Sequence, residues 1–462
     1  MQNFINKTWD DSITPTLVDY IKIPNKSPVF DADWEAHGYM EQAVQLIADW
    51  CKAHAAKGMT LEIVREPGRT PVILMDIPGE GDKNILMYGH FDKQPEMVGW
   101  EEDLGPWRPV IRDDKLYGRG GADDGYSAFS ALTAINALQA QNIPHPRCVI
   151  LIEACEESGS YDLPFYVDKL RDQIGTPDLV ICLDSGAGNY EQLWGTTSLR
   201  GVINATLNIE MLTEGIHSGF GTGTAASTFR VLRQLLSRIE DENTGDMLLP
   251  ELSVDIPAIR EQQAILAADT LQNEVIDAIP LAENVQPVSN DIATLLLNRT
   301  WRASLEVTGM DHIPSVADGG SVLRPQLAAK LSVRIPPTCD VDVAVAALKE
   351  TLEANAPYNA RVSFTPLEAN AGWHAPQLNE TLAAQINEAS QVAFGKPAMY
   401  FGEGGTIPFM GMLGDKFPEA QFFITGVLGP KSNAHGPNEF LHLPFAKKIT
   451  ACVAHVLAAQ CG

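Results

Sequence analysis

Short apolar runs alternate with helical patterns along the first part of the chain. The spacing of Phe129, Leu132, Ile135 and Leu138 predicts a helix with one apolar face packed on a sheet. Because strands and helices take turns, this part predicts an α/β fold with a doubly wound, mostly parallel sheet. The predicted strands are 70–77, 84–88, 147–153 and 177–183, and the predicted helices include 34–56 and 126–141.

The pattern changes near residue 199. Polar and apolar residues then alternate as in half-exposed strands, which predicts a smaller α+β unit with an antiparallel sheet and helices on one face. Its predicted strands are 201–212, 303–308, 328–335 and 360–366, with helices at 227–241 and 341–354. After residue 373 the first pattern resumes, with a helix near 378–393, a strand at 421–427 and a helix from 445. We therefore predict a catalytic domain formed by 1–198 and 373–462, and an inserted dimerisation or lid domain at 199–372.

Composition narrows the classes of partner. The chain has 462 residues and a formal net charge of −26, which argues against binding to nucleic acid or to an anionic membrane surface. We find no signal-peptide pattern and no long apolar span, so a cytoplasmic location is the expectation. The seven cysteines are scattered and form no CxxC pair, as in a protein with reduced thiols.

Polar groups gather where the predicted strands end. His90 and Asp92 follow the strand at 84–88, and at this spacing both side chains leave an extended chain on the same side. In a doubly wound sheet, functional groups collect beyond the carboxyl ends of the strands. The other candidates are Asp123 and Asp124 at the start of a helix, Glu156 and Glu157 after a strand, Asp184 after the next strand, and His435 in a Gly/Pro/Asn loop.

Each candidate also has an ordinary structural explanation. Asp123 or Asp124 could cap the helix, and Asp184 could be a turn residue. Glu156 and Glu157 could be a solvated pair, and His435 a loop histidine. Considered together, however, clustered carboxylates repel one another, and no lysine or arginine recurs at these strand ends to balance them.

A bound metal would supply the missing positive charge. Two histidines with several carboxylates and no cysteine suit zinc, cobalt or manganese. Five candidate ligands are too many for one tetrahedral zinc with an open position but suffice for two ions that share a carboxylate. In this interpretation His90 binds metal and Asp92 hydrogen-bonds its far ring nitrogen.

Seven motifs, in this order, carry a resemblance to a known family: YGHFDKQP, LYGRGGADD, EESGS, LDSG, GIHSG, EGGTIP and NAHGPNE. The chain resembles the co-catalytic dizinc M20 metallopeptidases, which include carnosinase-type dipeptidases, carboxypeptidase G, and the acetylornithine and succinyl-diaminopimelate deacylases. The resemblance implies two divalent ions, with zinc favoured and cobalt or manganese as alternatives. It also implies that Asp123 bridges the ions, that His90 and Asp184 complete one site and Glu157 and His435 the other, that Glu156 is the general base, and that Asp92 orients a ligand.

The resemblance extends to the inserted domain. It implies that His217 stabilises the oxyanion in the active site of a partner subunit, and hence a homodimer formed through this domain. It further implies that Arg334 grips a substrate carboxylate near Gly405 and Thr406, although Arg334 could be a sheet-surface arginine and Thr406 a turn residue. Two positions depart from the family: Tyr126 stands in a turn where many relatives have Asp-Asp-Lys-Gly, and Gly402 stands where dipeptidases usually have arginine.

These residues favour hydrolysis of dipeptides or short peptides with a free C-terminal carboxylate. The alternative is N-acyl amino acid deacylation, which would use the same metals and the same base. A non-catalytic binding protein on this fold would be expected to lack a ligand or the base, and none is missing.

Overall fold

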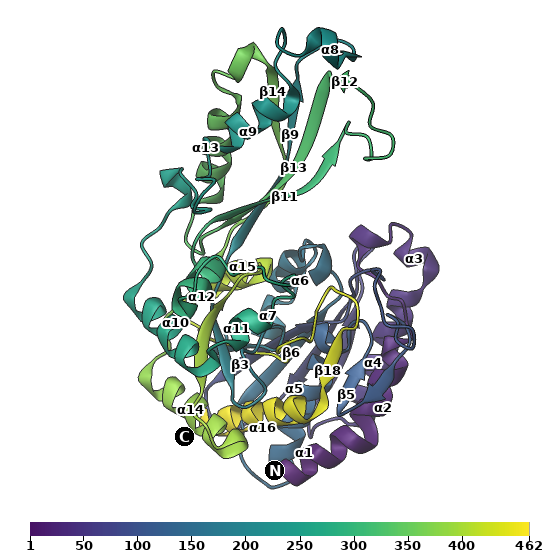
Figure 1. The fold of residues 1–462 in the computed structure, drawn as a ribbon. Coiled ribbons are helices and arrows are strands. Elements are labelled where there is room, and N and C mark those ends of the chain that lie inside the picture. The colour runs from purple at the N-terminus through teal and green to yellow at the C-terminus, as the bar shows by residue number, and fades with distance from the viewer. Residues whose placement is uncertain (462) are drawn as a thin grey trace. The chain divides into compact units, whose positions relative to one another are not determined.

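The computed structural model describes residues 1–461, which form two compact units (Figure 1). Unit 1 comprises Met1–Thr197, Ala375–Phe401 and the residues from Met412 onward, and unit 2 comprises Ser198–His374 and Gly402–Gly411. The segment Gly402–Gly411 differs from the prediction, which placed it in the catalytic domain. It packs in unit 2 because Gly402 lies against Ser198 and Thr300, and because the Thr406 hydroxyl donates to the Arg200 carbonyl.

The sheet of unit 1 is mixed. Its four central strands, β6 (Arg147–Glu153), β3 (Asn84–His90), β7 (Leu179–Cys182) and β17 (Gln421–Ile424), are parallel neighbours in that order. The flanking strands run antiparallel to their neighbours: β1 (Thr60–Val64) and β2 (Val72–Ile77) beside β6, and β8 (Trp194–Leu199) beside β17. The predicted α/β class is confirmed, and the four central strands of the sheet pair in parallel.

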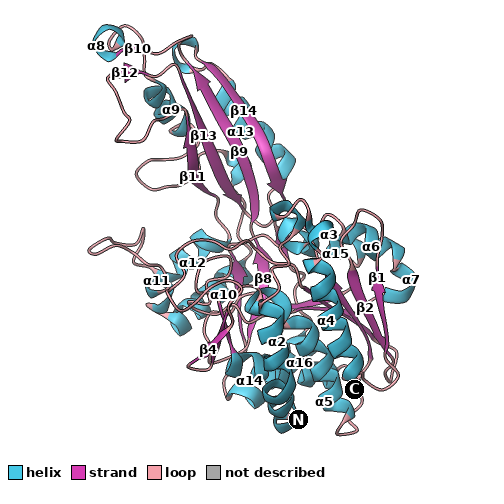
Figure 2. Ribbon diagram, turned by 90° about the vertical axis from the view of Figure 1, so that its right-hand side faces the viewer, coloured by secondary structure: helices cyan, strands magenta, loops and turns pink. Residues whose placement is uncertain are grey.

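Helices α4 (Tyr39–Ala53), α5 (Ser127–Gln139) and α16 (Leu443–Ala459) lie side by side in unit 1 (Figure 2). The predicted packing of α5 on the sheet is confirmed, but its burial goes further: all but two of its residues are buried. The reason is that α5 packs on β3 and β6 and is covered in turn by α1 (Gln2–Thr8), α4 and α16.

The predicted helix at 34–56 is two helices. Gly38 has φ +70, so α3 (Trp34–His37) ends there and α4 begins at the next residue. The N-terminal helices α1 and α2 (Thr14–Ile21), with a π-helical turn (Trp9–Ile13) between them, were not predicted. None of the described helices is long and apolar enough to cross a membrane.

A small three-stranded sheet in unit 1 was also not predicted. It joins β4 (Val110–Arg112), β5 (Lys115–Tyr117) and β18 (Phe440–His442), with β5 in the middle. Tyr117 pairs with Phe440, so distant parts of the sequence are held together just before Asp123 and just after His435. The other elements of unit 1 are α6 (Leu163–Lys169), α7 (Arg171–Ile174), α14 (Glu380–Phe394), β16 (Met399–Glu403) and α15 (Pro408–Lys416), of which the last two extend into unit 2.

Unit 2 is built on a four-stranded antiparallel sheet. The strand order is β11 (Ser304–Asp311), β13 (Gln326–Ile335), β9 (Gly201–Glu210) and β14 (Arg361–Asn370). Alternate residues of β9 and β13 form a core with α9 (Thr228–Leu236) and α13 (Val341–Glu353), as the period of two predicts. The remaining elements are β10 (Ile216–His217), α8 (Ser218–Gly221), α10 (Ala258–Leu271), α11 (Glu274–Asp277), α12 (Ile292–Thr300), β12 (Val322–Leu323) and β15 (Trp373–His374).

Candidate metal centre

Three neighbouring parallel strands end at the same edge of the unit 1 sheet. β3 ends at His90, β6 is followed by the turn Glu156–Ser158, and β7 is followed by Asp184. The strands are apolar and buried because both faces of the sheet are covered, so the chain turns polar only at their ends. Parallel pairing therefore brings His90, Glu156, Glu157 and Asp184 together.

Asp123 enters from the turn Gly121–Gly125 that precedes α5. This turn and the start of α5 approach β3 closely at Gly89, where an added Cβ would lie 2.1 Å from the Oγ of Ser127, the first residue of α5. The same Cβ would lie 2.6 Å from Asp124 Oδ2, which accepts a hydrogen bond from the His90 backbone N–H at 3.1 Å. Only glycine at position 89 leaves room for the turn that delivers Asp123.

His435 comes from the loop before β18. Its backbone has φ +64, in the left-handed region that is uncommon for residues other than glycine, and Asn433 and Asn438 share this conformation. Its side chain is 56% exposed, whereas Asp123 is buried. The position of this imidazole is therefore set by the loop backbone more than by packing of the ring.

The acidic and imidazole groups form two clusters within unit 1. The first comprises His90, Glu156 and Asp184, and the second comprises Asp123, Glu157 and His435; in each, one possible ligand atom per residue lies within 4.8 Å of the others. His90 Nε2 is 3.7 Å from Asp184 Oδ2 and 4.0 Å from Glu156 Oε2. His435 Nε2 is 3.2 Å from Glu157 Oε2.

Asp123 touches both clusters with different oxygens. Its Oδ1 is 3.2 Å from His90 Nε2, and its Oδ2 is 3.0 Å from His435 Nε2. A carboxylate with one oxygen directed to each cluster has the arrangement that a bridging ligand requires.

Asp92 is fully buried beside the first cluster. Its Oδ1 is 3.3 Å from His90 Nδ1, which is within ion-pair distance. His90 Nδ1 has no hydrogen-bond partner of good geometry, however. Its two oxygens accept the backbone N–H groups of Glu156 and Glu157 at 3.1 and 3.0 Å. Asp92 thus holds the turn that carries both glutamates as well as facing the histidine.

Burial, assisted by neighbouring charges, raises the pKa values of Glu156, Glu157 and Asp184, whereas for Asp123 the bonds from His435 and His90 outweigh burial and lower the pKa. Burial is the main cause, and with the charge of Asp184 it raises the pKa of Glu156 well above its usual value. Burial, followed by repulsion from Asp123, raises the pKa of Glu157 to about 8, and burial raises that of Asp184 to about 6. Burial lowers the pKa of His435, but the charge of Glu157 and the bond to Asp123 outweigh it and raise that pKa.

Divalent cations fit this set of groups. Two like charges 4 Å apart repel by about 4 kcal/mol at an effective dielectric constant of 20, and among the described residues no lysine or arginine forms an ion pair with the carboxylates of the two clusters. Glu157 Oε1 is buried without a hydrogen-bond partner. The donors are imidazole nitrogen and carboxylate oxygen only, which suits zinc, cobalt or manganese.

Two buried cations are close in sequence to the site residues: Lys93 directly follows Asp92, and Arg119 precedes Asp123 by four residues. Lys93 donates to the carbonyls of Tyr20 and Ile23, and Arg119 pairs with Glu439. Both are therefore engaged elsewhere and leave the clusters negative.

The structure also assigns contacts to residues that sequence analysis had left without a role. Gln94 donates to Glu157 Oε2 at 2.5 Å, and the Tyr126 hydroxyl donates to the Leu183 carbonyl. Gln94 stands in the motif YGHFDKQP and Tyr126 lies just after LYGRGGADD, but their partners are far along the chain, and no local pattern identifies them. Tyr126 thus links the end of the Asp123 turn to the end of β7.

The other predicted site residues belong to unit 2. Arg334 Nη1 donates to the Thr406 Oγ1 at 3.3 Å, and a Cβ on Gly405 would meet no atom within 4 Å. His217 is exposed, and its Nδ1 accepts the Gly219 N–H at 3.2 Å, which leaves Nε2 as the protonated nitrogen. Arg334 and Thr406 are thus adjacent, and Gly405 leaves open space beside them.

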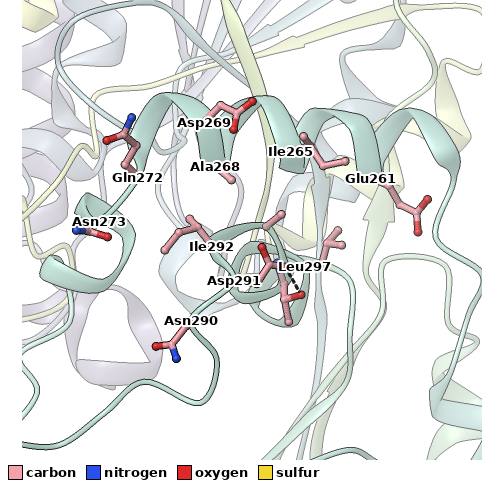
Figure 3. Close-up of a pocket in the computed structure, with 12 residues that line it drawn as sticks. Glu261, Ile265, Ala268, Asp269, Gln272, Asn273, Asn290, Asp291, Ile292 and Leu297 are labelled. Atoms are coloured by element: carbon pink, nitrogen blue, oxygen red, sulfur yellow. Dashed lines mark hydrogen bonds between the residues drawn. The ribbon is translucent and has the colours of Figure 1, made fainter.

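Unit 2 also contains a pocket of about 710 Å³ between α10 and α12 (Figure 3). Its lining combines acidic groups such as Glu261 and Asp269 with the apolar side chains of Ile265 and Leu297. No site residue predicted from the sequence lines it, so it does not bear on the proposed chemistry.

The two clusters could together hold a pair of metal ions, and comparison with known proteins identifies the family. The family model described as Peptidase family M20/M25/M40 matches residues 86–459. The chain belongs to this family and is a hydrolase of peptide bonds.

Similar proteins include several dipeptidases. The chain is 24% identical over 455 residues to a cysteinylglycine-S-conjugate dipeptidase of Corynebacterium striatum, covering 94% of this chain and 96% of the relative. It is 25% identical to the beta-Ala-His dipeptidase of Rattus norvegicus over 73% of this chain and 69% of the relative. Human carnosine dipeptidase 1 has the same fold, with a TM-score of 0.79, 19% identity, and coverage of 99% of this chain and 98% of that one.

Proposed function

We propose that this protein hydrolyses dipeptides and similarly short substrates that have a free C-terminal carboxylate. The observation that carries the proposal is the similarity, over 94% of the chain, to a dipeptidase, together with two clusters of possible metal ligands. The Arg334 guanidinium beside Thr406 supports a subsite for the substrate carboxylate, because arginine binds carboxylates with paired donors.

The proposed ligands follow the two clusters. His90 and Asp184 would hold one ion, Glu157 and His435 the other, and Asp123 both. Zinc is the proposed metal, with cobalt and manganese as alternatives. Two bound cations would polarise the substrate carbonyl and make a water molecule more acidic.

The remaining residues would handle the proton and the oxyanion. We assign Glu156 as the general base that takes a proton from the attacking water and gives it to the departing amine. Glu156 lies within the first cluster and could also be a ligand, but its carboxylate is farther from His90 Nε2 than that of Asp184, at 4.0 against 3.7 Å. Asp92 keeps the glutamate turn and His90 in place.

His217 is proposed to act across a homodimer interface formed by unit 2. Its exposure and its protonated Nε2 suit a group that donates to an oxyanion. A cytoplasmic location remains part of the proposal, supported by the free thiols of all seven cysteines.

The test is a substrate panel with purified, metal-loaded enzyme. The panel compares dipeptides with a free C-terminus, the same dipeptides amidated at the C-terminus, and N-acyl amino acids. We expect turnover of free dipeptides, with kcat/KM at least about tenfold lower for the amidated ones because a charged hydrogen bond of about 1.5–3 kcal/mol is lost. Cleavage of N-acyl amino acids without turnover of any dipeptide would reject the proposal in favour of deacylation.

A further inference from the structure

Arg119 is a buried arginine that joins three separate segments. Only 1% of its side chain is exposed, and it lies between β5 and the turn that carries Asp123. Its Nε donates to the Pro95 carbonyl at 3.2 Å, and its Nη1 pairs with Glu439 Oε2 at 2.5 Å. The guanidinium therefore links the loop after β3 to the start of β18.

The same guanidinium binds the loop that carries His435. Arg119 Nη2 donates to the backbone carbonyl of His435 at 3.1 Å and to that of Gly436 at 2.8 Å. His435 is in the left-handed conformation, and its own side chain is largely exposed. The loop backbone thus depends on contacts made by other residues, and Arg119 makes two of them at the histidine itself.

Glu439 completes the connection from the other side. It is fully buried, its Oε1 accepts the Gly120 N–H at 2.9 Å, and its backbone carbonyl accepts the Gly118 N–H at 3.0 Å. Arg119 precedes Asp123 by four residues, and Glu439 follows His435 by four. The ion pair therefore sits at equal sequence distance from two members of the second cluster.

We propose that the Arg119–Glu439 ion pair is a positioning clamp for the second cluster, Asp123, Glu157 and His435. The clamp fixes the His435 loop against the Asp123 turn, so the affinity of this cluster for its ion depends on it. The ion at the first cluster is less sensitive, because His90 is the last residue of β3 and Asp184 follows β7 by two residues, and these are neighbouring strands of the central sheet. This inference rests on the proposed dimetal site.

The decisive variant is Arg119→Lys. Lysine keeps the charge for Glu439 but has no planar fork, so it cannot bind Glu439, the two loop carbonyls and Pro95 together. Glu439→Gln tests the clamp from the other side, since it removes the charge and keeps the size. Arg147→Lys is the matched control, because Arg147 also pairs with an aspartate and binds two helix-end carbonyls, but far from the His435 loop along the chain.

The readout is metal binding rather than activity. Chelator-treated proteins are titrated with Zn²⁺ in equilibrium dialysis and with Co²⁺ followed by visible absorption, after circular dichroism has identified the folded variants. We expect the wild type and Arg147→Lys to bind two ions. Arg119→Lys and Glu439→Gln are expected to keep one ion and to lose at least about tenfold in affinity for the other, which is the usual effect of removing a group that orients a ligand.

A double variant separates a clamp from general damage. His435→Ala should weaken the same ion, and adding Arg119→Lys to it should cause little further loss. Two wild-type affinities in either folded clamp variant, or equal weakening of both ions, would overturn the clamp. Failure of both clamp variants to fold, beside a folded Arg147→Lys, would also overturn it, because the pair would then support the whole unit. If the wild type binds no metal, it is the proposed function that fails.

Discussion

His90 and Asp92 stand two residues apart and face each other, with His90 Nδ1 3.3 Å from Asp92 Oδ1. Both groups are fully buried, and the Asp92 carboxylate also accepts the N–H groups that begin the glutamate turn. The short motif at the end of β3 therefore supplies a possible metal ligand, His90, and also Asp92, which holds Glu156 and Glu157 in place.

The first prediction concerns Asp92→Asn. The amide keeps the size of the carboxylate but replaces one acceptor with a donor, which would face a backbone N–H of the glutamate turn. We expect kcat and metal affinity to fall about 10- to 100-fold, as for other groups that orient metal ligands. Steady-state kinetics and dialysis measure both, and an active variant with unchanged metal content would contradict the role of Asp92.

The second prediction concerns Glu156→Gln. If Glu156 transfers the proton, the variant should lose about 10²- to 10⁴-fold in kcat while KM changes little. Two ions should still bind, because the proposed ligands are intact. Loss of one ion together with activity would instead make Glu156 a ligand, a role that its place in the first cluster allows.

The third prediction is the pH dependence of the metal-free protein. Glu157 has a folded-state pKa raised to about 8 and Asp184 to about 6, above the values of about 4 for the unfolded chain. At pH values between the unfolded-state and the folded-state pKa of each group, the folded state binds more protons than the unfolded state. The free energy of unfolding therefore falls as the pH rises through this range. We expect the melting temperature of chelator-treated protein to drop from pH 5 to 8.

Bound metal should remove that loss, since cations favour the ionised carboxylates. The metal-loaded protein should therefore melt at a temperature that changes less over the same range. The variant Glu157→Gln should flatten the metal-free profile in the same way. A metal-free melting temperature that rises from pH 5 to 8 would show that the acidic cluster does not control stability.

The fourth prediction tests whether His217 acts across subunits. Glu156→Ala and His217→Ala proteins should each be nearly inactive, and mixing them should restore activity. In a twofold dimer with random exchange of subunits, about one quarter of the sites would contain both residues. Absence of recovery after demonstrated subunit exchange would place His217 within its own subunit or outside the mechanism.

Sequence pattern was a good guide to the elements of both units. The predicted strand at 147–153 is β6 and the predicted helix at 341–354 is α13, each within one residue of its observed ends. Alternation of apolar and polar residues identified the strands, and apolar residues spaced three or four apart identified the helices. These patterns work because the buried face of an element requires apolar residues. The helices α1 and α2 and the strand β5 were not predicted because they are only 7, 8 and 3 residues long, too short for a period to stand out in the sequence.

By itself the sequence determined the fold class, the strand ends and the kinds of chemical group they carry, since these depend on local periodicity and residue type. The tertiary structure alone decided which groups meet. The bond between Arg119 and Glu439 joins residues 320 positions apart, and the two oxygens of Asp123 face histidines from different segments. Such partners are chosen by chain topology and close packing, which bring distant residues together without any local signal in the sequence.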